Sequence, residues 1–193
     1  MSYPVGRFVL FESVGVVVVF EVSRQVARRL SLAAELPAEH PAVFDEIGGL
    51  VDGLPDPQWL CAEQRAGSMA VAARLRDRFD AYLADLAAAA DEHADARVLH
   101  AGSTGMLVAV ATGANPQTGS GLVARGNALQ HLPVVHAAFR AGRISAAHVG
   151  VITAESPRIP TFADLEAEVV TIAEQVEPAE LRRFLRLLAE QCR

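Results

Sequence analysis

The sequence contains no lysine, because all 17 of its basic side chains are arginine. A lysine amine reaches the phosphates in a P-loop, forms Schiff bases with carbonyl substrates and pairs with ATP phosphates in protein kinases. These three kinds of site are therefore excluded. Only two cysteines occur, Cys61 and Cys192, and they lie far apart in the sequence. A disulfide framework and a structural zinc site are accordingly not expected.

Aromatic residues are also few, at 6% of the chain, although 51% of the chain is hydrophobic. Much of that hydrophobic content is alanine, which has the best helix propensity and lets helices approach closely. A chain of 193 residues is long enough to bury a sizeable core. The composition therefore predicts an all-α globular protein.

Charge is distributed unevenly along the chain, whose net charge is −6. Residues 101–160 carry four arginines and one acid, whereas the remainder carries 13 basic and 22 acidic residues. The middle segment is thus mildly basic within an acidic chain. Such a segment permits a nucleic-acid-binding face without requiring one.

The pattern divides the chain into three regions, the first of which is an N-terminal extension over residues 1–43. Its apolar stretch Phe8–Phe20 is too short to span a bilayer, contains Glu12 and is not followed by a signal-peptide cleavage site. We therefore expect a cytoplasmic protein with no membrane association. Two interpretations of residues 1–24 stay open: a strand-like extension, or a poorly ordered tail from an upstream start codon. A short helix is predicted over 22–36.

The second region, residues 44–95, contains a short helix over 44–54 and a long amphipathic helix over 57–93. Asp56 and Pro57 are typical of a helix start. Apolar residues then recur at intervals of three and four, which places them on one stripe of the helix. The stripe indicates either a core-facing helix or the seam of a homodimer. Its members are Ala72, Leu75, Phe79, Tyr82, Leu86 and Ala90.

The third region, residues 96–193, is predicted to be a compact cluster of short helices. Glycine, proline and capping residues recur at close intervals and set their boundaries. The predicted helices cover 97–111, 116–131, 133–142, 145–155, 161–176 and 178–192, with Thr161 as the cap of the fifth.

One apparent motif, Gly119-Ser120-Gly121-Leu122-Val123-Ala124, matches the glycine pattern of dinucleotide-binding folds. That site needs its glycines directly after a strand and an acid about 20 residues later. Six residues separate Thr112 from Gly119, and the region near 140–145 holds arginines but no acid. We therefore reject a nucleotide site. The six histidines form no metal-binding pattern either, so no cofactor, metal or catalytic site is expected.

The run TGANPQTGSGLVARGNALQHLPVVHAAFRAGRISAAHVGVI, residues 112–152, resembles the domain of unknown function 222 family, also called 13E12 repeat proteins. The resemblance lies in a Thr-Gly turn, a proline-started helix, Leu-Pro, Ala-Gly-x-Ile-Ser and Ala-His. It covers about residues 45–193. In this chain the motifs are Thr112-Gly113, Asn115-Pro116, Leu132-Pro133, Ala141–Ser145 and Ala147-His148.

The resemblance implies association with nucleases, since such proteins often end in an HNH endonuclease module. This sequence holds no HNH-type cluster, so we expect a truncated, non-catalytic member that contacts DNA through residues 112–145. Two alternatives stay open. The first is a protein-interaction or dimerisation module acting through the 57–93 helix. The second is a decayed gene remnant.

The same stretch also resembles the helical DNA-binding part of ParB-like partition proteins. By that resemblance 97–111 is the first helix of a helix-turn-helix, 113–115 the turn and 116–131 the recognition helix. Glycines 119, 121 and 126 would each cost this helix about 1 kcal/mol relative to alanine, so fraying is expected. The predicted DNA-contacting residues are Thr118, Ser120, Arg125 and Gln130, with Arg140 and Arg143 on phosphates.

Helix packing is the alternative interpretation of this segment, with Leu107, Leu122, Leu129, Val135 and Ile144 in the core. Six further residues are predicted to shape turns and helix ends. Gly142 would end one helix in a left-handed turn, Ser145 would cap the next, and His148 would hydrogen-bond inside that turn. The full set is Gly113, Pro116, Pro133, Gly142, Ser145 and His148.

Overall fold

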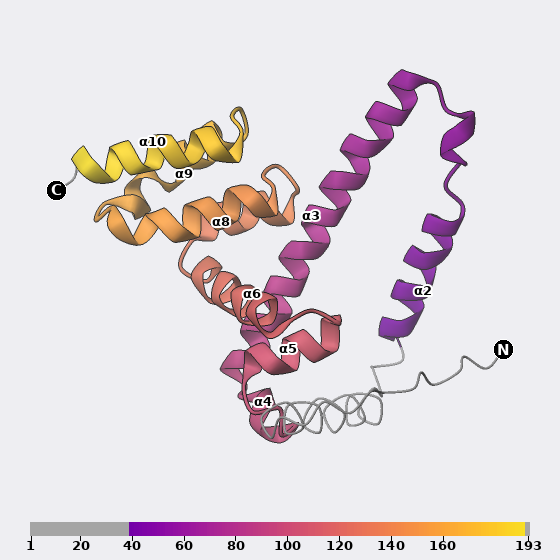
Figure 1. Cartoon of the computed structure of the whole chain (residues 1–193), viewed down its shortest axis with the longest axis horizontal. Helices are drawn as coiled ribbons and strands as arrows, with labels where there is room; N and C mark the ends of the chain where they lie inside the picture. Colours follow the sequence, from indigo (N-terminus) through magenta and orange to yellow (C-terminus); the bar gives the residue numbers. More distant parts are fainter. Residues whose placement is uncertain (1–38, 192–193) are drawn as a thin grey trace, which may run out of the picture.

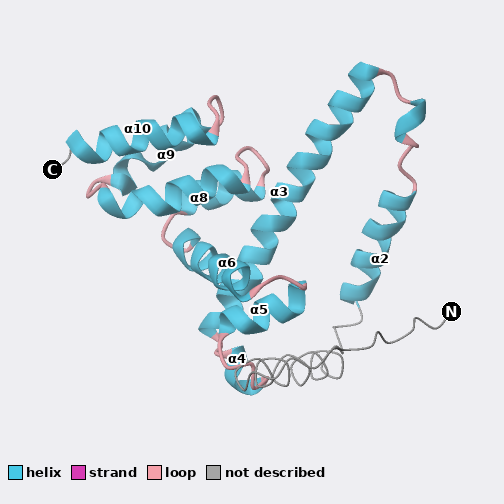
Figure 2. Cartoon of the chain, in the orientation of Figure 1, coloured by secondary structure: helices cyan, strands magenta, loops and turns pink. Residues whose placement is uncertain are grey.

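The computed structural model of the chain describes residues 39–191, all of which lie in helices or their connections (Figures 1 and 2). No strand occurs in that range, so the all-α prediction is confirmed. The interpretations of residues 1–24, the predicted helix over 22–36 and Cys192 lie outside it. The α-helices are α2 Glu39–Asp52, α3 Ala62–Glu92, α4 Asp95–Val98, α5 Thr104–Thr112, α6 Pro116–Leu129, α7 Pro133–Arg140, α8 Ala146–Glu155, α9 Phe162–Ala173 and α10 Pro178–Gln191.

The start of α3 differs from its prediction. Pro57 opens a separate 3-10 turn, η1 (Pro57–Trp59), in which the Asp56 side chain accepts a hydrogen bond from the backbone N–H of Gln58. Leu60 and Cys61 are extended, and α3 begins only at Ala62. The Asp-Pro signal therefore marks a turn rather than the first turn of the long helix.

The prediction of one continuous helix over 97–111 is also wrong, because a turn divides this segment into two helices. Residues 95–98 form the short α4, after which His100 and Gly102 adopt left-handed backbone angles, with φ of 53° and 76°. Ser103 then caps α5 by accepting from the N–H of Met106 at 3.2 Å. The Gly-Ser pair at 102–103 is an ordinary turn and cap signal, and it marks the true start of the helix.

A smaller difference concerns the start of α9, where Thr161 occupies the predicted N-cap position. Its side chain makes no capping hydrogen bond. The preceding turn instead closes through backbone bonds, in which the Phe162 N–H donates to Ile159 and the Asp164 N–H donates to Thr161.

Two of the glycines in α6 are contact points between helices rather than weak positions. A Cβ atom on Gly119 would lie 2.1 Å from the carbonyl oxygen of Gly105 in α5, and one on Gly126 would lie 2.2 Å from that of Ala84 in α3. Only glycine allows backbones to approach this closely. The expected fraying is therefore wrong, and α6 is continuous from Pro116 to Leu129 because packing on two sides offsets the low propensity.

The core-facing side of α3 is made of alanine. Ala81, Ala84 and Ala88 are buried there, together with the carboxylate of Asp77. The large side chains of the predicted apolar stripe lie on the opposite side of the helix and are exposed, with relative exposures of 47% for Leu75, 38% for Phe79, 37% for Tyr82 and 48% for Leu86. Of the stripe, only Ala90 at its end is partly buried against a core cluster. The interpretation of the stripe as core-facing is therefore wrong.

The main core lies where α7, α8, α9 and α10 pack together with α3 and the end of α6. Its largest fully buried side chains include Phe139, Leu129, Ile152, Leu181 and Leu185. Of the core residues predicted for segment 97–145, Leu107, Leu129, Val135 and Ile144 are buried, and Leu122 is partly buried against the core. The packing interpretation of these five residues is confirmed.

Candidate functional site

The turn between α7 and α8 joins several elements through hydrogen bonds. Gly142 has a φ of 68°, and a Cβ atom there would lie 3.1 Å from the carbonyl oxygen of Arg74 in α3. Ser145 caps α8, while the His148 ring accepts from the Ser145 N–H at 3.2 Å. The Asp77 carboxylate accepts from the N–H of Ala146 at 3.3 Å. This turn is therefore fixed against α3 by both shape and polar contacts.

The other predicted structural residues also lie at helix boundaries. Gly113 ends α5 with a φ of 67°. Pro116 and Pro133 occupy the first turns of α6 and α7, where the absent N–H costs no helical hydrogen bond.

Both arginines predicted to meet phosphates have carboxylate partners. The guanidinium of Arg140 lies 3.7 Å from Asp85, whose other oxygen lies 2.7 Å from Nε2 of His136. Arg143 donates to Glu174 at 2.5 Å. A phosphate would have to compete with these carboxylates, which weakens the case for either side chain as a DNA contact.

The four predicted DNA-contacting residues of α6 do not share one face. Thr118 and Arg125 are seven residues apart and lie on the same side of the helix. Ser120 lies against α5, because a Cβ atom on Gly105 would come 2.3 Å from its hydroxyl oxygen. Gln130 is exposed beyond the last turn of the helix. The structure therefore brings together two of these residues.

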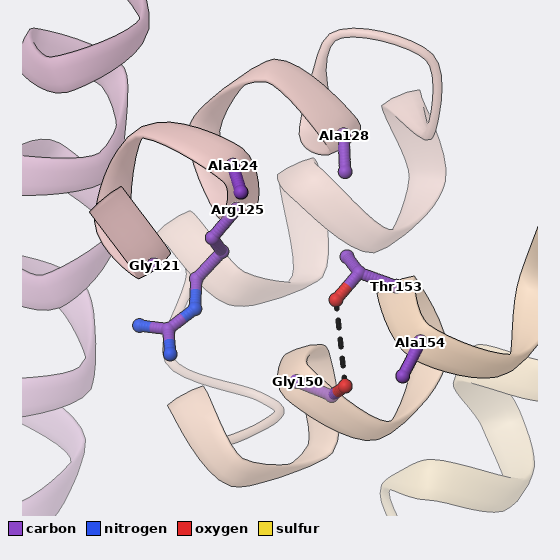
Figure 3. A pocket seen from close by; sticks show the side chains of 7 residues that line it. All are labelled: Gly121, Ala124, Arg125, Ala128, Gly150, Thr153 and Ala154. Carbon is purple, nitrogen blue, oxygen red and sulfur yellow. Dashed lines mark hydrogen bonds between the residues drawn. The ribbon is translucent and has the colours of Figure 1, made fainter. Parts of the chain in front are cut away.

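Arg125 lines a small hollow between α6 and α8 (Figure 3). The hollow has a volume of about 270 Å³ and is walled mainly by glycine and alanine. The hydroxyl of Thr153 donates to backbone carbonyls of its own helix, at 2.9 Å to Val149 and 3.4 Å to Gly150. Arg125 is thus the one charged side chain in the lining, which also includes Gly121, Ala124, Ala128 and Ala154.

A larger apolar groove lies between α2 and α3, which are connected at the top of Figure 1 and stand apart below it. Its volume is about 890 Å³, and Arg78 and Arg140 are its only charged lining residues. The apolar stripe of α3 forms one wall and the apolar side of α2 forms the other. The lining is completed by Val43, Phe44, Ile47, Leu50 and Val51 of α2, by Leu54 just after α2, and by Ala72, Leu75, Phe79 and Tyr82 of α3.

Sequence reasoning missed the α2 wall of this groove. Val43, Ile47, Leu50 and Leu54 recur at the three- and four-residue intervals of one helix face, so the signal was present in the sequence. Only the position of α2 in space shows that its apolar face and the stripe of α3 line the same groove.

The buried acids of the described chain all hold helices in place. Glu166 accepts from the N–H groups of Val134 and Val135, at 2.8 and 2.9 Å, and so caps α7. Glu155 is paired with Arg158 and Arg186. Within residues 39–191, no three His, Cys, Asp or Glu side chains gather where they could hold a metal ion.

A family model described as a domain of unknown function (DUF222) matches residues 64–192. The chain belongs to the DUF222 family. The match runs from the first turn of α3 almost to the chain end, whereas the resemblance was expected to begin near residue 45. No curated protein and no solved structure matches the chain. None of the helices between residues 39 and 191 is long and apolar enough to cross a membrane.

Proposed function

We propose that this DUF222 chain is a non-catalytic helical module that binds another polypeptide through the apolar groove between α2 and α3. The exposure of the α3 stripe carries the proposal. Soluble proteins rarely leave a contiguous apolar patch of large side chains in water, and such patches usually mark sites of association. Here the patch continues onto the end of α2 and the residues after it, through Leu50, Val51 and Leu54, which are 69, 59 and 67% exposed.

The arrangement of the groove supports a polypeptide ligand over a small molecule. Its walls come from two helices, so a helix lying in the groove would contact both walls. Amphipathic helices are recognised in this way, by anchors at three- and four-residue intervals. The polar groups that fix the orientation of a small ligand are scarce here, since only Arg78 and Arg140 line the groove.

The proposal that the module is non-catalytic rests on how its polar groups are used. The carboxylates of Asp77, Glu155 and Glu166 are buried and engaged by backbone N–H groups or arginines. His148 is occupied by Ser145 and by the carbonyl of Val176. None of these groups lines the hollow between α6 and α8 or the apolar groove, where a reacting molecule would have to bind.

A photocrosslinking experiment tests the groove. A benzophenone amino acid is placed at Phe79 in one variant and at exposed Ala163 of α9 in a control. We expect crosslinks to a polypeptide from position 79 only, and we expect loss of those crosslinks when Leu75→Glu is added. Equal crosslinking at both positions, or none at 79, contradicts the proposed function.

Contact with DNA through residues 112–145 is a second candidate, favoured by one observation. Arg125 has no carboxylate within ion-pair distance in the described chain, and Thr118 lies on the same side of α6. Fluorescence anisotropy with duplex DNA at low and moderate salt tests this candidate, because phosphate contacts make affinity fall with salt. Absence of salt-sensitive binding at micromolar protein, or binding that survives Arg125→Ala unchanged, removes it.

A further inference from the structure

We infer that the occupant of the apolar groove is the α3 helix of a second copy of this chain, lying antiparallel to the first. This inference deepens the proposed function by naming the partner. It rests on the order of charged residues beside the stripe, which the groove alone does not determine.

The stripe of α3 follows a heptad pattern over its central turns. Leu75, Phe79, Tyr82 and Leu86 are spaced by four, three and four residues, which is the spacing of a two-helix seam. In an antiparallel pair centred between Phe79 and Tyr82, Phe79 of each copy meets Tyr82 of the other. Leu75 then meets Leu86 in the next layer on both sides.

One flank of the stripe carries charges in an order that matches opposite charges on the same flank of an antiparallel second copy. Arg78, Asp85 and Glu92 lie seven residues apart and therefore occupy equivalent positions along that flank. In a parallel pair each of these positions faces the residue five places further along the partner, so Arg78 would face Leu83 and Asp85 would face Ala90, with no opposite charge. An antiparallel pair places opposite charges together instead.

The register set by the apolar layers also fits these charges. In an antiparallel pair, the residue just before Phe79 and the residue three places after Tyr82 flank the same layer. These residues are Arg78 of one copy and Asp85 of the other, and twofold symmetry produces the pair twice. The two criteria, apolar layers and charge order, thus select the same alignment independently.

Both side chains are available for this contact in the single chain. Arg78 is exposed and lines the groove. The Asp85 side chain is 29% exposed, and its contacts with His136 and Arg140 leave acceptor capacity on the carboxylate. The apolar face of α2, on the other wall of the groove, then lies over the partner's helix and completes a four-helix arrangement.

The test measures the mass of the full chain by light scattering across a concentration series. We expect a dimer for the wild type and a monomer for Phe79→Glu, with circular dichroism melts showing that both are folded. Arg78→Asp and Asp85→Arg each place like charges in both pairs, so each should weaken dimerisation by about tenfold. An equimolar mixture of these two variants restores both opposite-charge pairs and should form a heterodimer with affinity close to that of the wild type.

The other outcomes separate this inference from the proposed function. A wild type that is monomeric and binds an apolar dye, with binding lost in Phe79→Glu, contradicts a second copy as the occupant. That result leaves the groove as a binding site for a different polypeptide. A monomeric wild type that binds no dye overturns both. A monomeric wild type in which position 79 crosslinks to residues 1–38 of the same chain also contradicts a second copy as the occupant of the groove. A dimer that persists in Phe79→Glu, or charge variants that are not rescued by mixing, overturns the antiparallel alignment.

Discussion

Nε2 of His148, at the start of α8, donates a hydrogen bond to the backbone carbonyl of Val176, which lies 2.9 Å away beyond the end of α9. The other ring nitrogen accepts from the Ser145 N–H, so the proton is on Nε2. One imidazole therefore closes the first turn of its own helix and ties that turn to a distant part of the chain.

His148→Ala should lower the free energy of unfolding by about 2 kcal/mol, because it removes the tie and leaves the Val176 carbonyl without its partner. Urea denaturation followed by circular dichroism measures this change. His131→Ala, at an exposed position after α6, is the control and should change stability by less than about 0.5 kcal/mol. Equal effects for the two variants would show that the tie contributes nothing.

Gly126→Ala and Gly121→Ala should change stability in opposite directions although both lie in α6. The new methyl at 126 would collide with the Ala84 carbonyl, so we expect a loss of about 2 kcal/mol or more. Position 121 has no atom within 4 Å of the added Cβ, so alanine's better helix propensity should raise stability by about 0.5–1 kcal/mol. Thermal melts of the pair test this, and destabilisation by both substitutions would contradict the packing.

Glu166→Ala should destabilise the protein by about 2–3 kcal/mol, because two N–H groups at the start of α7 lose their acceptor in a buried place. Glu166→Gln keeps one acceptor oxygen and should cost less. Exposed Glu168 supplies the matched control, since Glu168→Ala removes a carboxylate of the same helix that caps nothing. Chemical denaturation of the three variants should rank them in that order.

The Asp91 carboxylate should make stability depend on pH at the acid end. The hydrogen bond from Thr104, and next the one from Asn127, lower the pKa of Asp91 below its ordinary value of 3.8. A lowered folded-state pKa means that the contribution is present above pH about 4 and is lost as pH falls through the folded-state pKa. Asp91→Asn should therefore be less stable than the wild type at pH 7, and the difference should shrink toward pH 3. A difference that is constant with pH would exclude this role for the charge.

The sequence predicted much of the helical cluster because its boundaries carry local signals. Pro116, Pro133, Ser145 and Pro178 each mark a helix start that depends only on neighbouring backbone geometry. The break at residues 99–103 is signalled locally by Gly102 and Ser103, but nothing in the local sequence requires the left-handed angle that His100 adopts.

The orientation of α3 could not be predicted from hydrophobicity alone. Large apolar side chains normally face the core, but Gly126 of α6 can approach α3 only over small residues such as Ala84 and Ala88. That match involves residues about 40 positions apart in the sequence. The apolar faces of α2 and α3 can each be recognised from their spacing, but the groove between them cannot, because it depends on how the two helices lie relative to each other in space.

The two glycine contacts of α6 have a mechanical consequence. A helix held at Gly119 by one neighbour and at Gly126 by another cannot rotate or slide without driving its backbone into a carbonyl oxygen. Arg125 therefore projects from a helix that is held in place. A ligand of its guanidinium would bind to a surface that is already formed.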